Sequence, residues 1–215
     1  MVFTAIARTG ILAAIVVLGG GGVVDRHVVL QKQDDAADAA RLAELLAIGP
    51  GSVVADVGAG SGPLVPFMST RVGAAGRVYA TDVSPDRLAE LRALVSKESL
   101  TNVTVREGAA AHTNLPDGCC DALFMRLVYH HFGDPPAMNA SLWRSLKPGG
   151  RLAVVEFAPQ TGESAPPGQR NEGDRHGVMP ATVINELKAA GFVDVQEATW
   201  SPPGFAVVAR RPDRR

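Results

Sequence analysis

The sequence predicts an α/β fold in which a mostly parallel, doubly wound sheet carries helices on both faces. Three observations predict this fold. Apolar strand patterns alternate with amphipathic helical patterns, a glycine-rich turn follows the first strand, and an acidic residue ends the second. With 215 residues, 46% of them apolar and 20% charged, the chain forms one globular domain with a short appendage.

A helix and a buried strand open the domain. Asp34 stands where an acidic residue favours a helix start, and leucines at helical spacing continue the pattern up to Gly51. Residues 52–57, rich in Val and Ala, predict the first strand, and residues 77–82 predict the second. Ser84 then caps a helix with a proline in its first turn and leucines on its inward face.

The middle of the chain continues the alternation. Residues 103–106 and 122–125 predict two more strands, and a helix over residues 136–146 precedes a strand at residues 152–157. Pro148-Gly149-Gly150 predicts the turn that ends this helix.

A Pro- and Gly-rich loop over residues 159–177 leads into the last part of the domain. A helix over residues 181–190 stops at Gly191, where a glycine is expected. Strands at residues 192–197 and 205–209, joined by Ser, Pro and Gly, complete the pattern.

Residues 1–24 differ from the rest of the chain. Arg8 precedes an apolar run, Ile11 to Leu18, and four glycines follow. This order is typical of a signal peptide or a weak membrane anchor, with a buried N-terminal helix as the alternative. Residues 1–24 are therefore predicted to form a leader that is separate from the folded domain.

Charge and cysteine content narrow the function classes. The 21 basic and 22 acidic side chains give a net charge of -1, so the chain lacks the basic surplus that nucleic-acid binding draws on. The two cysteines, Cys119 and Cys120, are adjacent and cannot form a disulfide framework. We expect free thiols, because neighbouring residues bridge only with strain.

The turn after the first strand is Gly58-Ala59-Gly60-Ser61-Gly62, preceded by Asp56. Alternate glycines let the backbone turn tightly and approach a ligand closely. The spacing is GxGxG, and Pro63 stands where a dinucleotide fingerprint needs its third glycine. The motif alone leaves a purely structural turn open as an alternative.

Asp82 ends the second strand. In a parallel sheet, ligands bind beyond the carboxyl ends of the strands, where a carboxylate can accept both hydroxyl hydrogens of a ribose. A helix-capping role is the alternative, although Ser84 already supplies a cap.

Two further motifs follow the glycine-rich turn and Asp82. The four motifs, in order, are Val53 to Gly62, Asp82, Leu115-Pro116 ahead of Asp121-Ala122-Leu123, and Leu146 to Leu152. With these motifs the chain resembles the class I S-adenosylmethionine-dependent methyltransferases, and within them the small-molecule branch that includes quinone-ring carbon methyltransferases. The match runs from about Gln31 to Ala209, within a methyltransferase domain assigned to residues 25–215. The resemblance implies a Rossmann-like seven-stranded sheet with an antiparallel C-terminal strand, and S-adenosylmethionine as cofactor.

The resemblance also implies roles for single residues. Asp56 and the three turn glycines would hold the methionine part and the ribose edge, Asp82 the ribose hydroxyls, and Val83 the adenine. The full set of predicted cofactor-binding residues is Asp56, Gly58, Gly60, Gly62, Asp82, Val83, Gly108 and Ala109. Relatives commonly carry an acid after the glycine at position 108, and here Ala109 stands there. Glu107, His112 or the backbone would then contact the adenine amino group, or this contact is missing.

Methyl transfer from a sulfonium rests mainly on holding the nucleophile close and aligned, and a base helps when the nucleophile carries a proton. Tyr129, His130 and His131 are the predicted catalytic residues, because they cluster after the fourth strand. Arg126 and His176 are the predicted substrate-binding residues. A structural role for the histidines is the alternative.

The sequence disfavours a metal site and arsenite methylation, and it leaves two alternative functions open. Adjacent histidines point apart, so a metal site formed with Asp134 or Glu156 is not expected. Arsenite methylation needs separated cysteines, which this chain lacks. A non-catalytic S-adenosylmethionine-binding protein remains the main rival, and a nicotinamide-dependent oxidoreductase the second.

The expected partner is a small molecule, with membrane association through residues 1–24. Two locations fit: a cytoplasmic domain tethered to the membrane by its leader, or export with the leader as a signal. Arg8 ahead of the apolar run favours placing the domain on the far side of a membrane, whereas S-adenosylmethionine is made in the cytosol. The acceptor and the oligomeric state are not set by the sequence.

Overall fold

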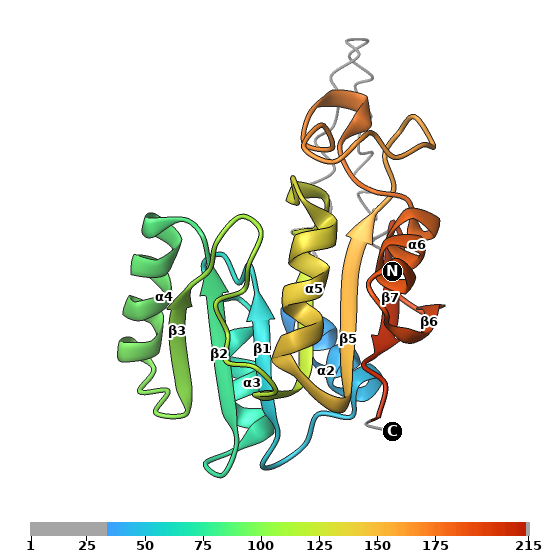
Figure 1. The fold of residues 1–215 in the computed structure, drawn as a ribbon. Helices are drawn as coiled ribbons and strands as arrows, with labels where there is room; N and C mark the ends of the chain where they lie inside the picture. Colours follow the sequence, from blue (N-terminus) through green and yellow to red (C-terminus); the bar gives the residue numbers. More distant parts are fainter. Residues whose placement is uncertain (1–33, 214–215) are drawn as a thin grey trace, which may run out of the picture.

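The computed structural model describes residues 34–213 as one sheet with helices on both faces (Figure 1). The strands are β1 (Val53–Val57), β2 (Arg77–Asp82), β3 (Val103–Glu107), β4 (Cys120–Arg126), β5 (Leu146–Phe157), β6 (Val193–Ala198) and β7 (Gly204–Arg210). The helices are α2 (Asp35–Leu46), α3 (Val65–Val72), α4 (Pro85–Lys97), α5 (Pro135–Ser145) and α6 (Pro180–Ala189), with short 3-10 turns η1 (Tyr129–His131) and η2 (Gly173–Arg175).

The seven strands follow the order β3-β2-β1-β4-β5-β7-β6. Strands β1 to β5 pair in parallel, whereas β7 runs antiparallel to both β5 and β6. This topology confirms the predicted mostly parallel, Rossmann-like sheet with an antiparallel C-terminal strand. The chain winds outward from β1 to β3 and then returns to β4 on the other side of β1. The carboxyl ends of β1 and β4 therefore meet where the strand order reverses.

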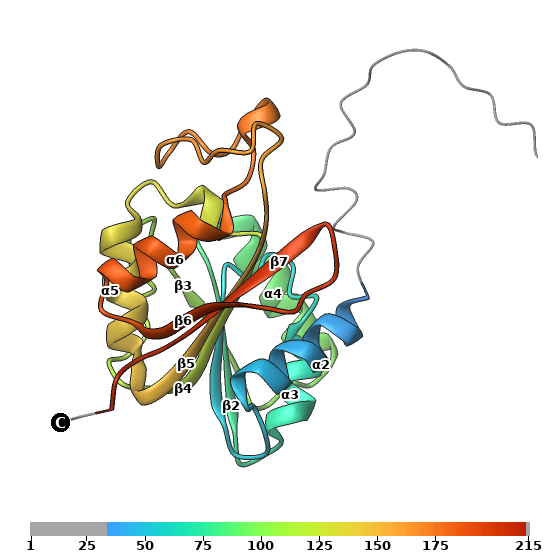
Figure 2. The same cartoon turned by 90° about the vertical axis from the view of Figure 1, so that its right-hand side faces the viewer.

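The two faces of the sheet bury separate cores (Figure 2). On β4, Leu123 and Met125 pack toward α5 and α6, whereas Phe124 between them packs toward α2 and α3. This alternation follows from the two-residue period of a strand, because both faces of a covered sheet must be apolar. Helix α4 packs a third, smaller cluster through Leu88 and Leu91.

Local signals place the helix starts where the sequence predicts them. The carboxylate of Asp34 accepts from the N–H groups of Ala36 and Ala37, and Ser84 Oγ accepts from the N–H of Arg87. Helix α3, for which the sequence patterns assign no range, has no side-chain cap at its N-terminus. Only eight residues long, it shows too little periodicity to be predicted.

Two predictions are wrong. Pro148-Gly149-Gly150 lies inside β5, which already begins at Leu146, so it forms a bulged strand rather than a turn. The register shift against β4 accommodates the glycine of positive φ, Gly149.

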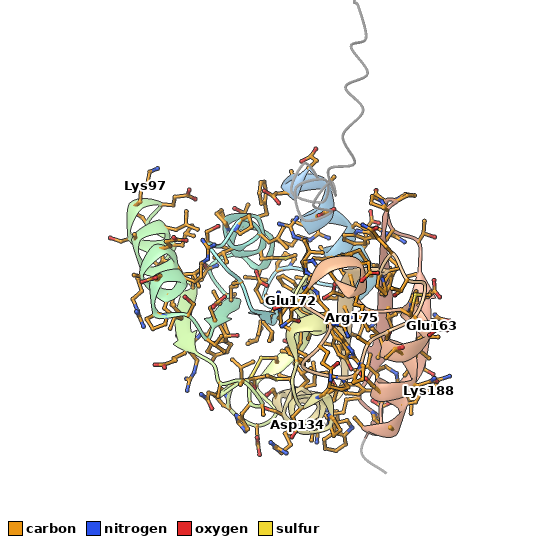
Figure 3. The ribbon with its side chains drawn as sticks, turned by 90° about the horizontal axis from the view of Figure 1, so that it is seen from above. Lys97, Asp134, Glu163, Glu172, Arg175 and Lys188 are labelled. Carbon is orange, nitrogen blue, oxygen red and sulfur yellow. A yellow bond between two sulfur atoms is a disulfide. The ribbon has the colours of Figure 1, made fainter. Side chains whose placement is uncertain are left out.

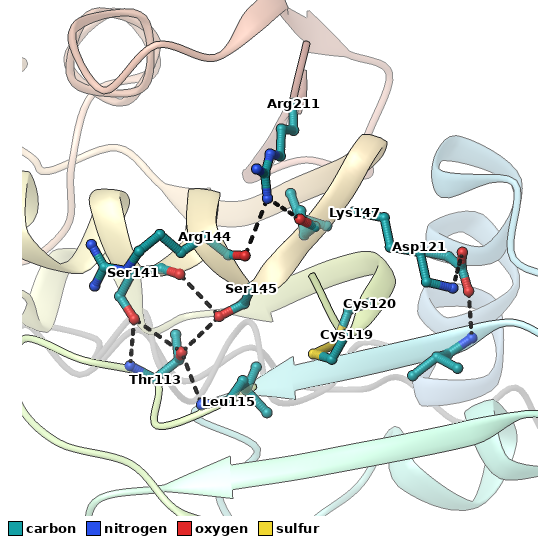
Figure 4. Close-up of a disulfide and its surroundings, with 12 residues drawn as sticks. Thr113, Leu115, Cys119, Cys120, Asp121, Ser141, Arg144, Ser145, Lys147 and Arg211 are labelled. Atoms are coloured by element: carbon teal, nitrogen blue, oxygen red, sulfur yellow. Dashed lines mark hydrogen bonds and ion pairs between the residues drawn. A yellow bond between two sulfur atoms is a disulfide. The ribbon is translucent and has the colours of Figure 1, made fainter. Parts of the chain in front are cut away.

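The second error concerns the cysteines. Cys119 and Cys120 are joined by a disulfide and are not free thiols (Figure 4). Both side chains lie at the amino end of β4, where Cys120 is buried in the core under α5 and Cys119 packs against it. This shared position brings the two sulfur atoms together.

The predicted leader, residues 1–24, lies outside the described residues. Within residues 34–213, no helix is both long and apolar enough to cross a membrane.

Candidate active site

A cavity of about 630 Å³ lies at the carboxyl ends of the central strands, where the strand order reverses. Its walls come from the turns after β1, β2, β3 and β4, the position at which open α/β sheets bind ligands. It is lined by Asp56, Val57, Gly58, Ala59, Gly60, Ser61, Pro63, Leu64, Thr81, Asp82, Val83, Arg87, Gly108, Ala109, Ala110, His112, Thr113, Arg126, Leu127, Val128, His131, Phe132 and Met138.

The three glycines of the turn after β1 have different structural roles. A Cβ at Gly58 would lie 2.6 Å from Val128 Cγ2, and one at Gly62 would lie 2.7 Å from Leu91 Cδ2. Gly58 lets the turn pack against Val128, which follows β4, and Gly62 lets it pack against α4. Gly62 does not line the cavity. Gly60 has a φ of +58°, and a Cβ there would meet nothing within 4 Å. Of the three, Gly60 is the one whose missing side chain leaves room for a ligand.

Asp82 links the glycine turn to the start of α4. Its Oδ2 accepts from the Gly60 N–H at 2.9 Å, and its Oδ1 accepts from the Ser84 N–H at 2.9 Å. A carboxylate oxygen has capacity for a second hydrogen bond, so both oxygens can also accept from a diol. The predicted capping and ligand-binding roles are therefore compatible. Val83, the next residue, is 58% exposed and lines the cavity, so its apolar side chain can contact a ligand there.

Asp56 is a buried carboxyl group at the end of β1. It is only 3% exposed, and burial raises the pKa of Asp56 to about 7, with Asp82 adding to the rise and Arg126 opposing it. A carboxylate in this position favours a cationic ligand, because positive charge offsets the cost of burying the negative charge.

The turn after β3 forms part of the cavity wall with small residues. Gly108 and Ala109 both line the cavity, and the Ala109 N–H donates to the carbonyl oxygen of His112 at 2.7 Å. His112 lines the cavity as well, whereas Glu107 does not. Of the side chains that the sequence offers for the adenine amino group, the geometry therefore favours His112.

Arg126, predicted to bind substrate, lines the cavity but is engaged by two carboxylates of α2. Its Nη1 lies 2.7 Å from Asp38 Oδ2, and its Nη2 lies 2.7 Å from Asp35 Oδ1. The Arg126 side chain is only 14% exposed. It fastens the first helix to the end of β4, a structural role at the wall of the site.

The predicted catalytic cluster separates in space. His131 is exposed and lines the cavity, whereas Tyr129 and His130 are fully buried and do not. The Tyr129 hydroxyl accepts from Asn139 Nδ2 at 2.8 Å. Burial, reinforced by the Glu186 carboxylate, raises the pKa of Tyr129 further above its usual range, so it stays protonated.

His130 meets two residues from elsewhere in the chain. Its Nδ1 lies 2.9 Å from both carboxylate oxygens of Glu156, and its Nε2 lies 3.1 Å from His176 Nε2. His176, predicted to bind substrate, is half-buried beside the cavity and is not part of its wall. From the sequence, Glu156 is a candidate only for a metal site, which is not expected. The signal for Glu156 is an acidic side chain within the apolar run Leu152 to Phe157. An acidic side chain is rarely fully buried unless it has a partner.

The loop from Ala158 to Gly177 stands over the same end of the sheet (Figure 1). Seen from above, Glu172 and Arg175 of this loop lie over the middle of the molecule, and Glu163 lies at its side (Figure 3). Arg170, buried within the loop, holds it to α6 through Glu186 Oε1 at 2.7 Å.

The fold and the cavity together define a Rossmann-like α/β protein with a site for an extended, nucleoside-bearing ligand. A family model described as a methyltransferase domain matches residues 55–154. The arsenite methyltransferase of Halobacterium salinarum is 29% identical over 157 residues, covering 71% of this chain and 40% of the relative. The ubiquinone/menaquinone biosynthesis C-methyltransferase UbiE of Teredinibacter turnerae is 34% identical over 116 residues, covering 54% and 47%.

A solved structure agrees with these relatives. A SAM-dependent methyltransferase from Aquifex aeolicus has a TM-score of 0.71 and 26% identity, covering 87% of this chain and 98% of that one. In sequence and in fold, the chain is similar to the class I S-adenosylmethionine-dependent methyltransferases, and this similarity supports S-adenosylmethionine as its cofactor. It spans less than half the length of the two curated relatives described above.

The residues present fit S-adenosylmethionine. The buried Asp56 carboxyl suits a ligand that carries positive charge, and Asp82 keeps acceptor capacity for the ribose hydroxyls. The space at Gly60 lets the backbone approach, and the exposed Val83 offers an apolar surface.

Proposed function

We propose that the protein transfers a methyl group from S-adenosylmethionine to a small molecule by in-line displacement. The observation that carries this proposal is a pair of carboxyl groups, Asp56 and Asp82, that line one cavity together with the open turn at Gly60. The cavity lies where the strand order reverses. Two acidic groups around one cavity fit a cationic donor better than a pyrophosphate, which like charges would repel.

S-adenosylmethionine supplies an activated methyl group whose leaving thioether needs no proton. The chain's own residues then have to orient the acceptor and exclude water. The end of the cavity next to β4 is suited to this, because apolar side chains surround His131 there. These side chains are Leu127, Val128, Phe132 and Met138. His131 is the exposed imidazole in this wall and is proposed to contact the acceptor.

The lining favours an apolar acceptor over an inorganic one. The relatives include a protein named for arsenite and others named for quinone biosynthesis. The two cysteines lie at the amino end of β4, and Arg126 at its other end lines the cavity. At about 3.3 Å per residue, a strand of this length separates them by about 20 Å, so these cysteines cannot hold an arsenic atom at the site.

Calorimetry tests the donor site. We expect S-adenosylmethionine and S-adenosylhomocysteine to bind to the wild-type protein and NAD to give no heat. Asp82→Ala should weaken binding of both at least about tenfold, since it removes charge-assisted hydrogen bonds to the ribose. The matched control is Asp86→Asn, a nearby carboxylate on α4 that does not line the cavity. Heat from NAD alone would overturn the assignment.

Release of S-adenosylhomocysteine from a panel of apolar ring compounds then separates an enzyme from a non-catalytic binder. Tight donor binding without any release across quinols, phenols and amines would favour the binder.

We also propose that residues 1–24 attach the domain to a membrane or direct its export. The support is the order of the charge, the apolar run and the small residues at this end of the sequence. Fractionation of cells and N-terminal sequencing of the mature protein distinguish the two. Recovery of the intact chain in the soluble fraction would contradict both.

A further inference from the structure

The first residue after β4, Leu127, has a left-handed backbone, with a φ of 62°. Within residues 34–213, the residues other than glycine that have a positive φ are Ala47, Ser99, Asn114, Leu127 and Asp194. Leu127 is the largest of these residues and the one that lines the cavity. A left-handed backbone brings Cβ too close to the following carbonyl oxygen, so this conformation is rare for a bulky residue.

Glycine occupies other left-handed positions of the same cavity. Gly58 and Gly60 line it with φ values of +73° and +58°. If only the course of the backbone mattered after β4, glycine would also meet that need there at lower cost. The chain carries a leucine instead, so the side chain at position 127 has a role that glycine cannot fill.

Core packing does not explain the Leu127 side chain. It is half-buried and, within the described part of the chain, packs against none of the three buried apolar clusters. By contrast, Met125 belongs to the core under α5 and α6, and Val128 packs against that core. Strained backbone conformations of this kind cluster at active sites. The wall of the cavity is therefore the place where this side chain acts.

The left-handed turn is held from two sides. The Leu127 N–H donates to the Val155 carbonyl oxygen at 2.9 Å, so the residue stays attached to β5. Val128 lies against Gly58, because a Cβ at Gly58 would lie 2.6 Å from Val128 Cγ2 and 2.7 Å from Val128 Cγ1. The chain then enters η1, whose His131 lines the cavity. The turn after β4 is thus fixed between β5 and the turn after β1.

We propose that Leu127 is a specificity-determining residue of the acceptor site. Its side chain fills space in the cavity and so limits the size of the apolar acceptor that fits beside Val128, Phe132 and Met138. This inference rests on the proposed methyltransferase function, and it adds the residue that selects among acceptors. The left-handed backbone is the stability cost of holding a leucine in this wall.

Truncation of Leu127 to alanine should enlarge the acceptor end of the cavity. The change removes the side chain beyond Cβ, and the three buried clusters lose no contact. In an apolar pocket, space for one methylene changes selectivity by about tenfold or more. The donor end should bind as before, because Gly60 and Asp82 lie in the turns after β1 and β2.

Calorimetry in the presence of S-adenosylhomocysteine tests the specificity role. The probes are phenol and 1-naphthol, which share an aromatic hydroxyl group and differ in the size of the apolar ring system. In Leu127→Ala, the ratio of the two dissociation constants should shift at least about tenfold in favour of 1-naphthol. The dissociation constant of S-adenosylhomocysteine should not change.

The matched control for this truncation is Leu45→Ala. Leu45 is a half-buried leucine of α2 that does not line the cavity, so the ratio should stay at its wild-type value. An unchanged ratio in Leu127→Ala would overturn the specificity role. Absence of binding of both probes to both the wild-type protein and Leu127→Ala would overturn it as well.

Urea unfolding tests the left-handed backbone without any ligand. At an ordinary φ, alanine is more stable than glycine, because glycine loses more conformational freedom on folding. At position 127 this order should reverse, and the folded-to-unfolded ratio of Leu127→Gly should exceed that of Leu127→Ala by about threefold. Higher stability of Leu127→Ala would overturn the proposal that a strained backbone holds this side chain.

The control for the backbone effect is Ala47→Gly. Ala47 is an exposed residue in a left-handed conformation at the end of α2, outside the cavity. This variant should gain stability and leave the ratio of the two probe dissociation constants unchanged. A shift of that ratio in Ala47→Gly would contradict the assignment of selectivity to the cavity wall.

The outcome for this inference is separate from the outcome for the proposed function. If the wild-type protein and Leu127→Ala both bind S-adenosylhomocysteine and show the same probe ratio, selection by Leu127 is refuted and the methyltransferase function stands. If the wild-type protein binds neither S-adenosylmethionine nor S-adenosylhomocysteine, the function itself is refuted, and selection among methyl acceptors with it.

Discussion

Asp56→Asn should make the ligand-free protein more stable at alkaline pH. Burial raises the pKa of this carboxyl from 3.8 to about 7 in the folded protein. The stability it contributes is therefore fully present below about pH 4 and is lost progressively as the pH rises to about 7. At 1.36 kcal/mol per pH unit, the raised pKa of Asp56 lowers the free energy of unfolding, relative to acidic pH, by about 4 kcal/mol at pH 8 and by about 2 kcal/mol at pH 5.

Urea unfolding of the ligand-free protein measures this cost. Asparagine has nearly the same shape and carries no charge, so the variant should gain up to about 4 kcal/mol in the free energy of unfolding at pH 8 and about half of that at pH 5. The same variant should bind S-adenosylmethionine more weakly, because it lacks the negative charge. Asp117→Asn, an exposed carboxylate in a surface turn, is the control and should change little. An equal stability of Asp56→Asn and wild type at pH 8 would refute the account of the buried charge.

Three further predictions concern the same site. The affinity of the wild-type protein for S-adenosylmethionine should rise as the pH increases from about 6 to about 8, because Asp56 ionises near pH 7. Calorimetry should find a smaller rise with S-adenosylhomocysteine, which lacks the sulfonium charge. An equal rise for the two ligands would contradict an interaction between the sulfonium and Asp56. Gly60→Ala should cost about 1 kcal/mol of stability yet weaken donor binding, whereas Gly62→Ala should cost about 1–3 kcal/mol through crowding against α4; the reverse order would show that the two glycines are misassigned. Arg126→Met should lower the free energy of unfolding by about 3 kcal/mol at pH 7, since it leaves Asp38 buried without its partner; a change confined to the KM for the acceptor would contradict its structural role.

The strand ends are the part of the site that the sequence predicts best. Asp56, Gly60 and Asp82 follow directly from two rules: apolar runs form the central strands, and ligands bind beyond their carboxyl ends. Both rules need only local sequence, and the strand topology then places these residues around one cavity.

The orientation of the predicted catalytic residues cannot be predicted from local sequence. Tyr129, His130 and His131 are consecutive, so the sequence places them in one region, yet in a 3-10 turn their side chains point in different directions. Which of them faces the cavity depends on packing against β5 and α5. Glu156 is a long-range partner, 26 positions from His130, and no local pattern records this pairing.

The packing of Gly62 and the pairing of the cysteines both depend on contacts that the local sequence does not record. The glycine belongs to a ligand motif by spacing but is required by the leucines of α4, which lie further along the chain. The disulfide depends on how the turn before β4 packs under α5. From the sequence alone, free thiols are expected, because adjacent cysteines bridge only with strain.

The central claim is that this cavity binds the adenosyl group of the methyl donor. A crystal structure of the protein with S-adenosylhomocysteine tests it most directly. We predict density for the ligand in the cavity, with both ribose hydroxyls within hydrogen-bond distance of the Asp82 carboxylate and the adenine against Val83. An empty cavity at saturating ligand, or a ligand bound elsewhere on the molecule, would contradict the account.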